Sequence, residues 1–259
     1  CEILGDTFEA IAREKAGIIK SGLPTVIGQL PPEAESVIRS ICKKRKSSLI
    51  SVAEEFGNDV STYPQTNLVG GCQRLNAATA LAVARVLESR FNLDEEISVS
   101  TLKDVYWPGR WEEQDLQHRK IIFDVTHNMD GAQWLEENLF RMTEEGIPKP
   151  DVIFGVMGDE RANLLVPLIA RFAKSITFVV PQQARSSTFE SLESFLPRSF
   201  SGSVVRGSVP ELFPSRGECS LDVPGTGPIL VTGSIYLIGE IWERFMEDGP
   251  LGQGILQDF

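Results

Sequence analysis

The sequence predicts an α/β fold with a mostly parallel sheet in the second half of the chain. From residue 120 onward, short apolar runs typical of buried strands alternate with helix-length segments. Strand, helix and strand at this spacing are typical of right-handed crossovers between parallel strands, which build a doubly wound sheet. The composition, 42% hydrophobic and 24% charged, is that of a globular protein and includes no apolar run long enough to cross a membrane.

The first half of the 259-residue chain alternates less regularly. A helix is expected to begin near Thr7, with Asp6 and Glu9 as its N-cap and reciprocal partner. Residues 54–72 are polar and rich in turn formers, and Asn76 stands at the expected start of a long helix. The pattern predicts helices over residues 7–19, 32–46 and 76–91 and strands over 23–28 and 48–53.

Pro108 and Gly109 interrupt the pattern, and we place a domain boundary there, between residues 105 and 106. The sequence thus predicts two domains, residues 1–105 and 106–259. In the second domain, strands are predicted over 120–126, 151–157, 175–180, 203–207 and 228–233, and helices over 129–145, 160–173, 188–195 and 235–247.

The net charge of −11 argues against a nucleic-acid or anionic-membrane partner, whereas a small anionic substrate needs only a local basic cluster or a helix N-terminus. The four cysteines form no C-x-x-C pair and the chain has two histidines, so neither a structural zinc site nor a disulfide framework is expected. This cysteine usage fits a reducing cytoplasm. Because the chain opens on Cys1 rather than Met, we expect it to be cut from a longer protein or processed.

Lys15 occupies an unusual position in the first helix. Helical spacing places it within an apolar stripe made by Phe8, Ile11, Ala12, Ile18 and Ile19. One interpretation is a lysine whose stem covers the core while its ammonium group reaches water. The other is a buried amine that loses its proton readily and takes part in chemistry.

Two predicted strands end in polar residues, at the edge where parallel sheets bind ligands. The stretch IIFDVTHN delivers Asp124 to a strand end and is followed by His127 and Asn128, which serve either as a helix cap or as functional groups. The stretch ILVTGSIYLIGEI passes from a strand through Gly233 and Ser234 into a helix. This turn either caps the helix or admits an anion such as a carboxylate.

Arg110, in the WPGRWE segment, lies at the predicted boundary, where clefts commonly form. Its guanidinium group suits a phosphate held by two parallel hydrogen bonds, or a neighbouring carboxylate.

Together, several stretches resemble, in order, motifs of folylpolyglutamate synthase and bifunctional dihydrofolate synthase, the folate branch of the Mur ligase superfamily. They are LGDTFEAIAREKAGIIKSG, QRLNAATALAV, WPGRWE, IIFDVTHN and ILVTGSIYLIGE, and they extend from residue 3 to about residue 247. The resemblance implies that residues 1–105 are the C-terminal part of a P-loop-type ATPase domain. It implies that residues 106–259 are a Rossmann-like Mur ligase C-terminal domain.

The resemblance also implies an ADP-forming ligase that uses ATP and Mg²⁺. Such an enzyme phosphorylates a carboxylate of dihydropteroate or a folate, and L-glutamate then attacks the acyl phosphate. Its implied partners are small molecules, with no nucleic acid or membrane, and its implied state is a monomer. The family's lysine in the E-K-A-G-I motif is typically carbamylated, and Lys15 matches it. A carbamylated Lys15 would be a catalytic group and a Mg²⁺ ligand.

Other residues match family positions one at a time. Asn76, Arg110 and Asp124 match residues that bind ATP, with phosphate charge assigned to Arg110 and ribose hydroxyls to Asp124. His127 matches a residue implicated in activity, where it would position the acyl phosphate or the amine. Ser234 matches the turn expected to hold the glutamate substrate.

The chain also departs from the family pattern. The G-T-N-G-K-G-S phosphate loop is absent, so residues 1–259 alone are expected not to turn over ATP. Glu160 stands where the family commonly has a lysine. One alternative is a peptidoglycan Mur ligase, although the first and last motifs favour the folate branch. The other is a non-catalytic chain that binds a folate. The combination of Lys15, Arg110, Asp124 and His127 argues against this alternative, because a pure binding protein does not need it.

Overall fold

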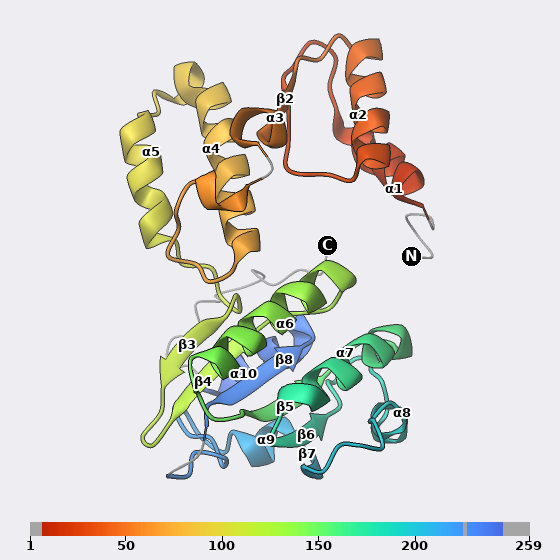
Figure 1. Cartoon of the computed structure of the whole chain (residues 1–259), viewed down its shortest axis with the longest axis vertical. Helices are drawn as coiled ribbons and strands as arrows, with labels where there is room; N and C mark the ends of the chain where they lie inside the picture. Colours follow the sequence, from red (N-terminus) through yellow and green to blue (C-terminus); the bar gives the residue numbers. More distant parts are fainter. Residues whose placement is uncertain (1–6, 58, 225–226, 246–259) are drawn as a thin grey trace. The chain divides into compact units, whose positions relative to one another are not determined.

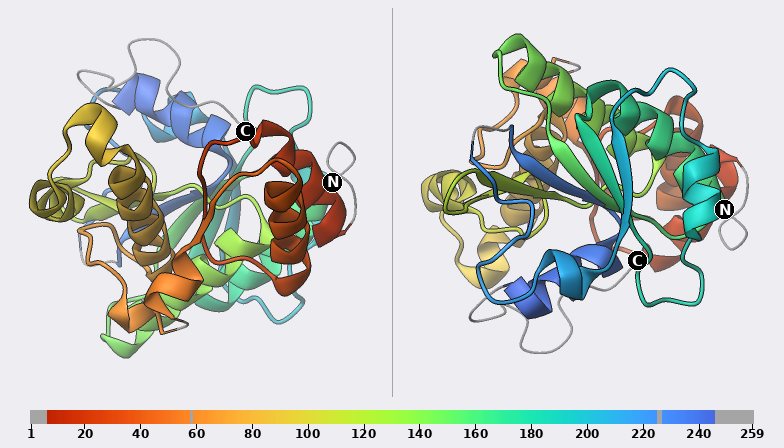
Figure 2. Two further views of the ribbon diagram at one scale, coloured as in Figure 1. Left: turned by 90° about the horizontal axis from the view of Figure 1, so that it is seen from above. Right: turned by 90° about the horizontal axis from the view of Figure 1, so that it is seen from below.

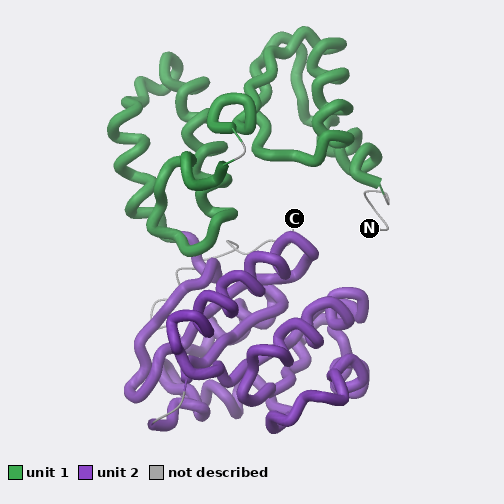
Figure 3. The backbone as a smooth tube through the Cα atoms, viewed as in Figure 1, with its two compact units in different colours: residues 1–106 green, residues 107–259 purple. Residues whose placement is uncertain are grey.

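The computed structural model describes residues 7–57, 59–224 and 227–245. The chain divides into two compact units, residues 1–106 (unit 1) and 107–259 (unit 2), as Figure 3 shows. This division lies one residue beyond the predicted boundary between residues 105 and 106. No helix among the described residues is long and apolar enough to span a membrane.

Unit 1 pairs a small parallel sheet with helices. The strands β1 (Thr25–Ile27) and β2 (Leu49–Ser51) are parallel, with Val26 opposite Ile50. Both are shorter than predicted, and α3 and α5 were not predicted. The helices are α1 (Phe8–Lys15), α2 (Pro32–Lys44), α3 (Val52–Phe56), α4 (Gly71–Phe91) and α5 (Glu95–Thr101), with short 3-10 turns at Ala16–Ile18, Val60–Thr62 and Leu102–Asp104.

The buried face of α1 differs from the predicted stripe. Ala12, Ala16 and Ile19 are buried together with residues of α2, whereas Phe8 is 59% exposed and Ile18 is 80% exposed. The helix tightens into a 3-10 turn at Ala16–Ile18, so the spacing of 3.6 residues per turn does not continue to Ile18. The predicted cap is also wrong in part. Asp6 lies outside the described residues, and the Thr7 side chain accepts the Ala10 N–H at 3.2 Å.

Unit 2 is a six-stranded sheet in the order β3-β4-β8-β5-β6-β7. Its described strands are parallel except β3, which pairs antiparallel with β4, so the mostly parallel sheet is confirmed. Figure 1 shows β8 lying between β4 and β5. The strands are β3 (Glu112–Asp115), β4 (Lys120–Asp124), β5 (Asp151–Gly155), β6 (Ser175–Val179), β7 (Ser203–Gly207) and β8 (Ile229–Gly233). The helices are α6 (Met129–Glu144), α7 (Asp159–Phe172), α8 (Phe189–Ser194), α9 (Val209–Leu212) and α10 (Ile235–Phe245).

Helices cover both faces of the unit 2 sheet. Figure 2 shows α6 and α7 on one face and α9 and α10 on the other. Alternate strand residues such as Phe123 and Val231 pack into one apolar cluster with Leu237 and Trp242 of α10. Because both faces are covered, every residue of the central strands β5 and β8 is buried. This burial explains why these strands are continuous apolar runs in the sequence.

A buried ion pair closes the amino edge of this sheet. Arg119 Nη2 lies 2.8 Å from Asp151 Oδ2, and their side chains are 2% and 10% exposed. The same guanidinium donates to the carbonyl oxygens of Leu221 and Pro228, at 2.8 and 3.0 Å. These contacts join the turn before β4, the start of β5 and the segment that enters β8.

Candidate functional site

The two polar strand ends predicted from the sequence are neighbours in the sheet. β8 pairs with β4 on one side and with β5 on the other. Asp124 is the register partner of Thr232, and Gly233 is the partner of Gly155. The carboxyl edge of β4, β8 and β5 therefore brings together IIFDVTHN and the turn of ILVTGS, which is where open parallel sheets bind ligands.

Asp124 is buried, and both of its carboxylate oxygens accept hydrogen bonds from the chain itself. The Thr126 hydroxyl donates to Oδ1, and the Trp111 backbone N–H donates to Oδ2 at 3.1 Å. Burial raises the pKa of Asp124 above its usual value, while the Thr126 hydroxyl, the nearby Arg110 charge and the Trp111 N–H act in the opposite direction. The carboxyl group is thus a fixed element of the turn that carries Arg110.

The segment around Arg110 is held against the end of β4. Arg110 Nη1 donates to the Val125 carbonyl oxygen at 3.0 Å, and the Val125 N–H donates to the Gly109 carbonyl oxygen at 2.8 Å. Gly109 has φ +69°, and a Cβ atom there would lie 2.9 Å from Val125 Cγ2, so glycine is required for both conformation and space. Arg110 and Asp124, two of the predicted nucleotide contacts, therefore lie at one place.

His127 lies between the buried end of β4 and the start of α6. It is half-buried, and the next residue, Asn128, caps α6 by accepting the Gly131 N–H at 2.7 Å. Asn128 therefore acts as a helix cap, which is one of the two interpretations that the sequence left open. His127 is held on the short connection between Asp124 and this cap, beside the carboxyl edge.

Ser234 serves the turn between β8 and α10. Its N–H donates to the Gly155 carbonyl oxygen at 2.8 Å, and its Oγ accepts the Tyr236 N–H at 3.1 Å. A Cβ atom at Gly233 would lie 2.3 Å from the same Gly155 oxygen, so close strand packing demands this glycine. The structure thus supports the interpretation of a turn with a capping serine. The Thr232 hydroxyl is buried and has no hydrogen-bond partner among the described residues.

Lys15 and Asn76 belong to unit 1. Lys15 is the last residue of α1 and is exposed, so its predicted apolar setting is wrong, because the buried face of α1 runs through Ala12 and Ala16. Asn76 does not open its helix, since α4 begins at Gly71, and its Nδ2 donates to Gln73 Oε1 at 3.1 Å. The capping preference of asparagine misplaced the start of this helix.

The described ranges hold no group of three or more His, Cys, Asp or Glu side chains that could bind a metal ion. That a carbamylated Lys15 binds Mg²⁺ stays a prediction. Mg²⁺ usually takes one or two protein carboxylates and completes its shell with water and substrate phosphates.

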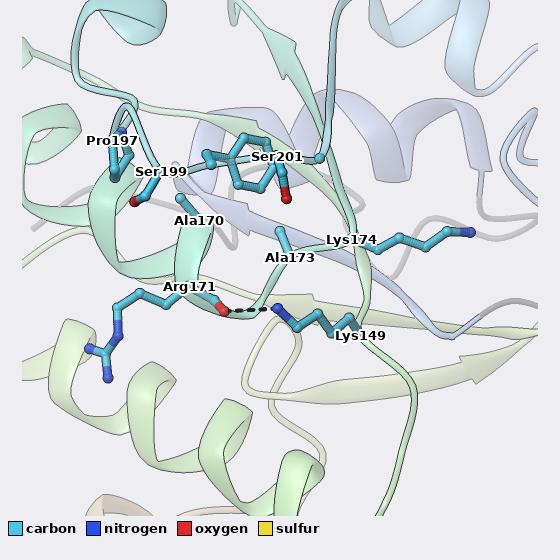
Figure 4. Close-up of a pocket in the computed structure, with 10 residues that line it drawn as sticks. Lys149, Ala170, Arg171, Ala173, Lys174, Pro197, Ser199 and Ser201 are labelled. Carbon is cyan, nitrogen blue, oxygen red and sulfur yellow. Dashed lines mark hydrogen bonds between the residues drawn. The ribbon is translucent and has the colours of Figure 1, made fainter.

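A basic pocket of about 410 Å³ lies at the opposite, amino edge of the unit 2 sheet. Its cationic side chains are Lys149, Arg171 and Lys174, and Figure 4 shows Arg171 and Lys174 pointing in different directions. Each has a partner within the protein: Lys149 donates to the Arg171 carbonyl oxygen, Arg171 pairs with Glu136, and Lys174 lies 3.9 Å from Asp151. The pocket therefore offers no convergent charge, and the carboxyl edge remains the candidate site.

Sequence reasoning missed Thr126 and Trp111, which bind Asp124. The contact with Thr126 could have been predicted, because a hydroxyl residue two positions after a strand-end aspartate can form a local side-chain hydrogen bond with it. The contact to Trp111 spans thirteen residues and depends on a left-handed backbone at Trp111 (φ +50°), which the sequence does not reveal.

No protein-family model matches the chain. It is 28% identical over 263 residues to the dihydrofolate synthase/folylpolyglutamate synthase of Bacillus subtilis, covering 93% of this chain. It is also 28% identical to the folylpolyglutamate synthase of Lacticaseibacillus casei, over 95% of this chain. The chain is thus similar to folylpolyglutamate and dihydrofolate synthases over most of its length.

Solved folylpolyglutamate synthases share the fold. The enzyme from Thermotoga maritima aligns with a TM-score of 0.69 and 23% identity over 92% of this chain. A Mycobacterium tuberculosis folylpolyglutamate synthase solved with ADP aligns with a TM-score of 0.70 and 22% identity over 92% of it. The predicted resemblance and fold class are confirmed. The chain spans 59% of the length of the B. subtilis relative and 58% of the T. maritima chain.

Proposed function

We propose that this chain is part of an ATP-dependent, ADP-forming ligase that joins L-glutamate to a folate, to dihydropteroate, or to both. One observation carries the proposal: the similarity to folylpolyglutamate and dihydrofolate synthases runs through both units, over 93% of the chain. In the reaction, ATP phosphorylates a substrate carboxylate, and the glutamate amine displaces phosphate from the resulting acyl phosphate. The protein must hold the reactants in line, neutralise phosphate charge and exclude water.

The proposed residue roles centre on the carboxyl edge of unit 2. Arg110 stabilises negative charge on the phosphoryl group, and Asp124 contacts ribose hydroxyls through lone pairs that Thr126 and Trp111 leave available. His127 positions the acyl phosphate or the incoming amine. Ser234 holds the glutamate substrate at the start of α10, where a helix N-terminus favours a carboxylate. In unit 1, Asn76 contacts ATP.

Lys15 is the proposed site of carbamylation and of magnesium binding. Its exposed position gives the amine access to carbon dioxide, and the modification would turn an ammonium group into a carboxylate on a long stem. When bound, Mg²⁺ would neutralise phosphate charge during transfer.

The test is a ligase assay on the full-length protein from its source, monitoring ADP release. We expect release to require L-glutamate together with dihydropteroate or tetrahydrofolate. Substituting Arg110→Ala should lower kcat by about 100-fold, because a charged donor to the transferring phosphoryl group is lost. Arg171→Ala is the matched control, since it removes a guanidinium from the opposite edge of the same unit.

Other outcomes would change the assignment. ADP release with UDP-muramyl peptides in place of folates would make the protein a peptidoglycan Mur ligase. Tight folate binding without glutamate-dependent ADP release would make it a binding protein. We also propose that the protein is a monomer and works in a reducing compartment. A mass of twice the chain mass, measured by light scattering, would contradict the monomeric state.

A further inference from the structure

We propose that Thr126 is a positioning residue, which locks the Asp124 carboxylate so that it holds the Gly109–Trp111 turn and the Arg110 side chain in place. The importance of Arg110 for nucleotide chemistry rests on the proposed function. The positioning itself is a property of unit 2 and is testable without any nucleotide.

Two segments are joined at this place, residues 109–111 and residues 124–126. Their backbones meet through the Val125 N–H and the Gly109 carbonyl oxygen, 2.8 Å apart. A second link runs from the Trp111 N–H to Asp124 Oδ2 at 3.1 Å, so the carboxylate grips the far side of the turn. The turn is therefore bonded to the strand end on both sides of Arg110.

Trp111 needs this grip because its backbone is in the left-handed region, at φ +50°. A bulky residue rarely adopts this conformation, and it persists only where its surroundings hold it. The Trp111 side chain is 4% exposed, so its packing holds one end of the residue. The Asp124 carboxylate holds the other end by accepting the N–H.

Thr126 determines the orientation of that carboxylate. Its hydroxyl donates to Oδ1 of Asp124, opposite the oxygen that accepts from Trp111. Thr126 is 2% exposed, so water does not readily replace the hydroxyl if it is removed. With one oxygen fixed by Thr126, the other is aimed at the Trp111 N–H.

Arg110 is the group that this arrangement presents. Its Nη1 donates to the Val125 carbonyl oxygen at 3.0 Å, between Asp124 and Thr126 in the chain. Its charge also acts on the Asp124 carboxyl group. A rotation of the carboxylate therefore changes the turn, the anchor of the guanidinium and the local field together.

The first experiment is NMR on the whole chain without nucleotide. In the wild type, we expect the Trp111 amide resonance to titrate together with the Asp124 side-chain carbon. A Trp111 amide that stays constant while Asp124 titrates would overturn the proposal, and this readout needs no variant.

The variants are Thr126→Val, which removes the hydroxyl, and Thr126→Ser, which keeps it. In Thr126→Val we expect the pKa of Asp124 to rise by about one unit, because a donor to the charged form is lost, and the Arg110 side-chain resonances to shift. Thr126→Ser should retain the wild-type titration. Thr143→Val is the matched control, since it removes a hydroxyl that donates to the Leu139 carbonyl oxygen within α6.

Unchanged Asp124 and Arg110 resonances in Thr126→Val would overturn the proposal. In the full-length ligase, Thr126→Val should lower kcat about tenfold with a smaller change in KM for ATP, as expected for a misplaced charge. Altered resonances with unaffected ATP turnover would leave the positioning role intact and count against the proposed function of Arg110.

Discussion

The guanidinium of Arg119 and the carboxylate of Asp151 form an ion pair inside unit 2, thirty-two residues apart in sequence, with 2.8 Å between Nη2 and Oδ2. Ser175 also donates its hydroxyl to Asp151, so the carboxylate is satisfied on both oxygens. Removing one member of such a pair leaves the other as an uncompensated charge in the protein interior.

Substituting Arg119→Ala should therefore destabilise unit 2 by about 3 kcal/mol, at the lower end for a broken buried pair because Lys174 remains 3.9 Å from Asp151. Urea denaturation followed by tryptophan fluorescence measures this change. Arg171→Ala, which breaks the exposed pair with Glu136, should change stability by less than about 1 kcal/mol. Equal effects of the two substitutions would contradict the structural role of Arg119.

Gly233→Ala should destabilise unit 2 by at least about 2 kcal/mol, from backbone strain and a clash. Gly233 has φ +116°, and the added Cβ atom would lie 2.3 Å from the Gly155 carbonyl oxygen. Gly146→Ala is the control, because Gly146 also has a positive φ, of +72°, but has open space around its Cβ position. The control should lose only about 1 kcal/mol, and thermal unfolding would reveal whether the clash adds to the strain.

The stability of unit 2 should depend on Asp124 ionisation. Burial raises the pKa of this carboxyl group in the folded state. The folded protein therefore binds a proton more tightly than the unfolded chain, and this contribution is lost as pH rises from about 4 through the raised pKa. Asp124→Asn removes that dependence. The urea midpoints of the wild type and of Asp124→Asn should diverge as pH changes across this window. Midpoints that change in parallel with pH would show that folding does not raise the pKa of Asp124.

Cys219 should resist alkylation in the folded protein. Burial raises the pKa of its thiol to about 11, so little thiolate is present at neutral pH. Cys72 is partly exposed and should react earlier. Treatment with iodoacetamide at pH 8, followed by peptide mass spectrometry, gives the order of labelling. Faster labelling of Cys219 would place that residue nearer to solvent than the structure does.

The second half of the fold was largely predictable because its signals are long and periodic. The buried strands β4, β5, β6 and β8 are apolar runs in the sequence, α6 and α7 separate the first three of them, and α10 follows β8. Residues 112–115 gave no such signal. Their strand, β3, is a polar edge strand that forms by pairing with β4, so long-range contact rather than local preference creates it.

In the first half, local rules were less reliable. The predicted stripe assumed a continuous α-helix as far as Ile18, but a 3-10 turn follows Lys15 and Ile18 is exposed. Phe8, in the first turn of α1, is also exposed, because the buried face of the helix runs through Ala12 and Ala16. The strand ends at Asp124 and Ser234 were found because topology brings such ends to one edge. The Asp124–Trp111 contact was not predicted, because it depends on the left-handed backbone of Trp111, which no residue preference indicates.

The place of β8 in the sheet has a consequence for biosynthesis. Residues 229–233 lie between strands formed by residues 120–124 and 151–155, so they must be inserted after both neighbours have been synthesised. When the ribosome has synthesised the chain through β7, β8 does not yet exist. The edges of β4 and β5 that pair with β8 in the finished sheet are then unpaired. Such an intermediate exposes two unpaired strand edges, which can pair with other chains. We therefore expect chaperones to stay bound to the nascent chain until residue 233 has left the exit tunnel.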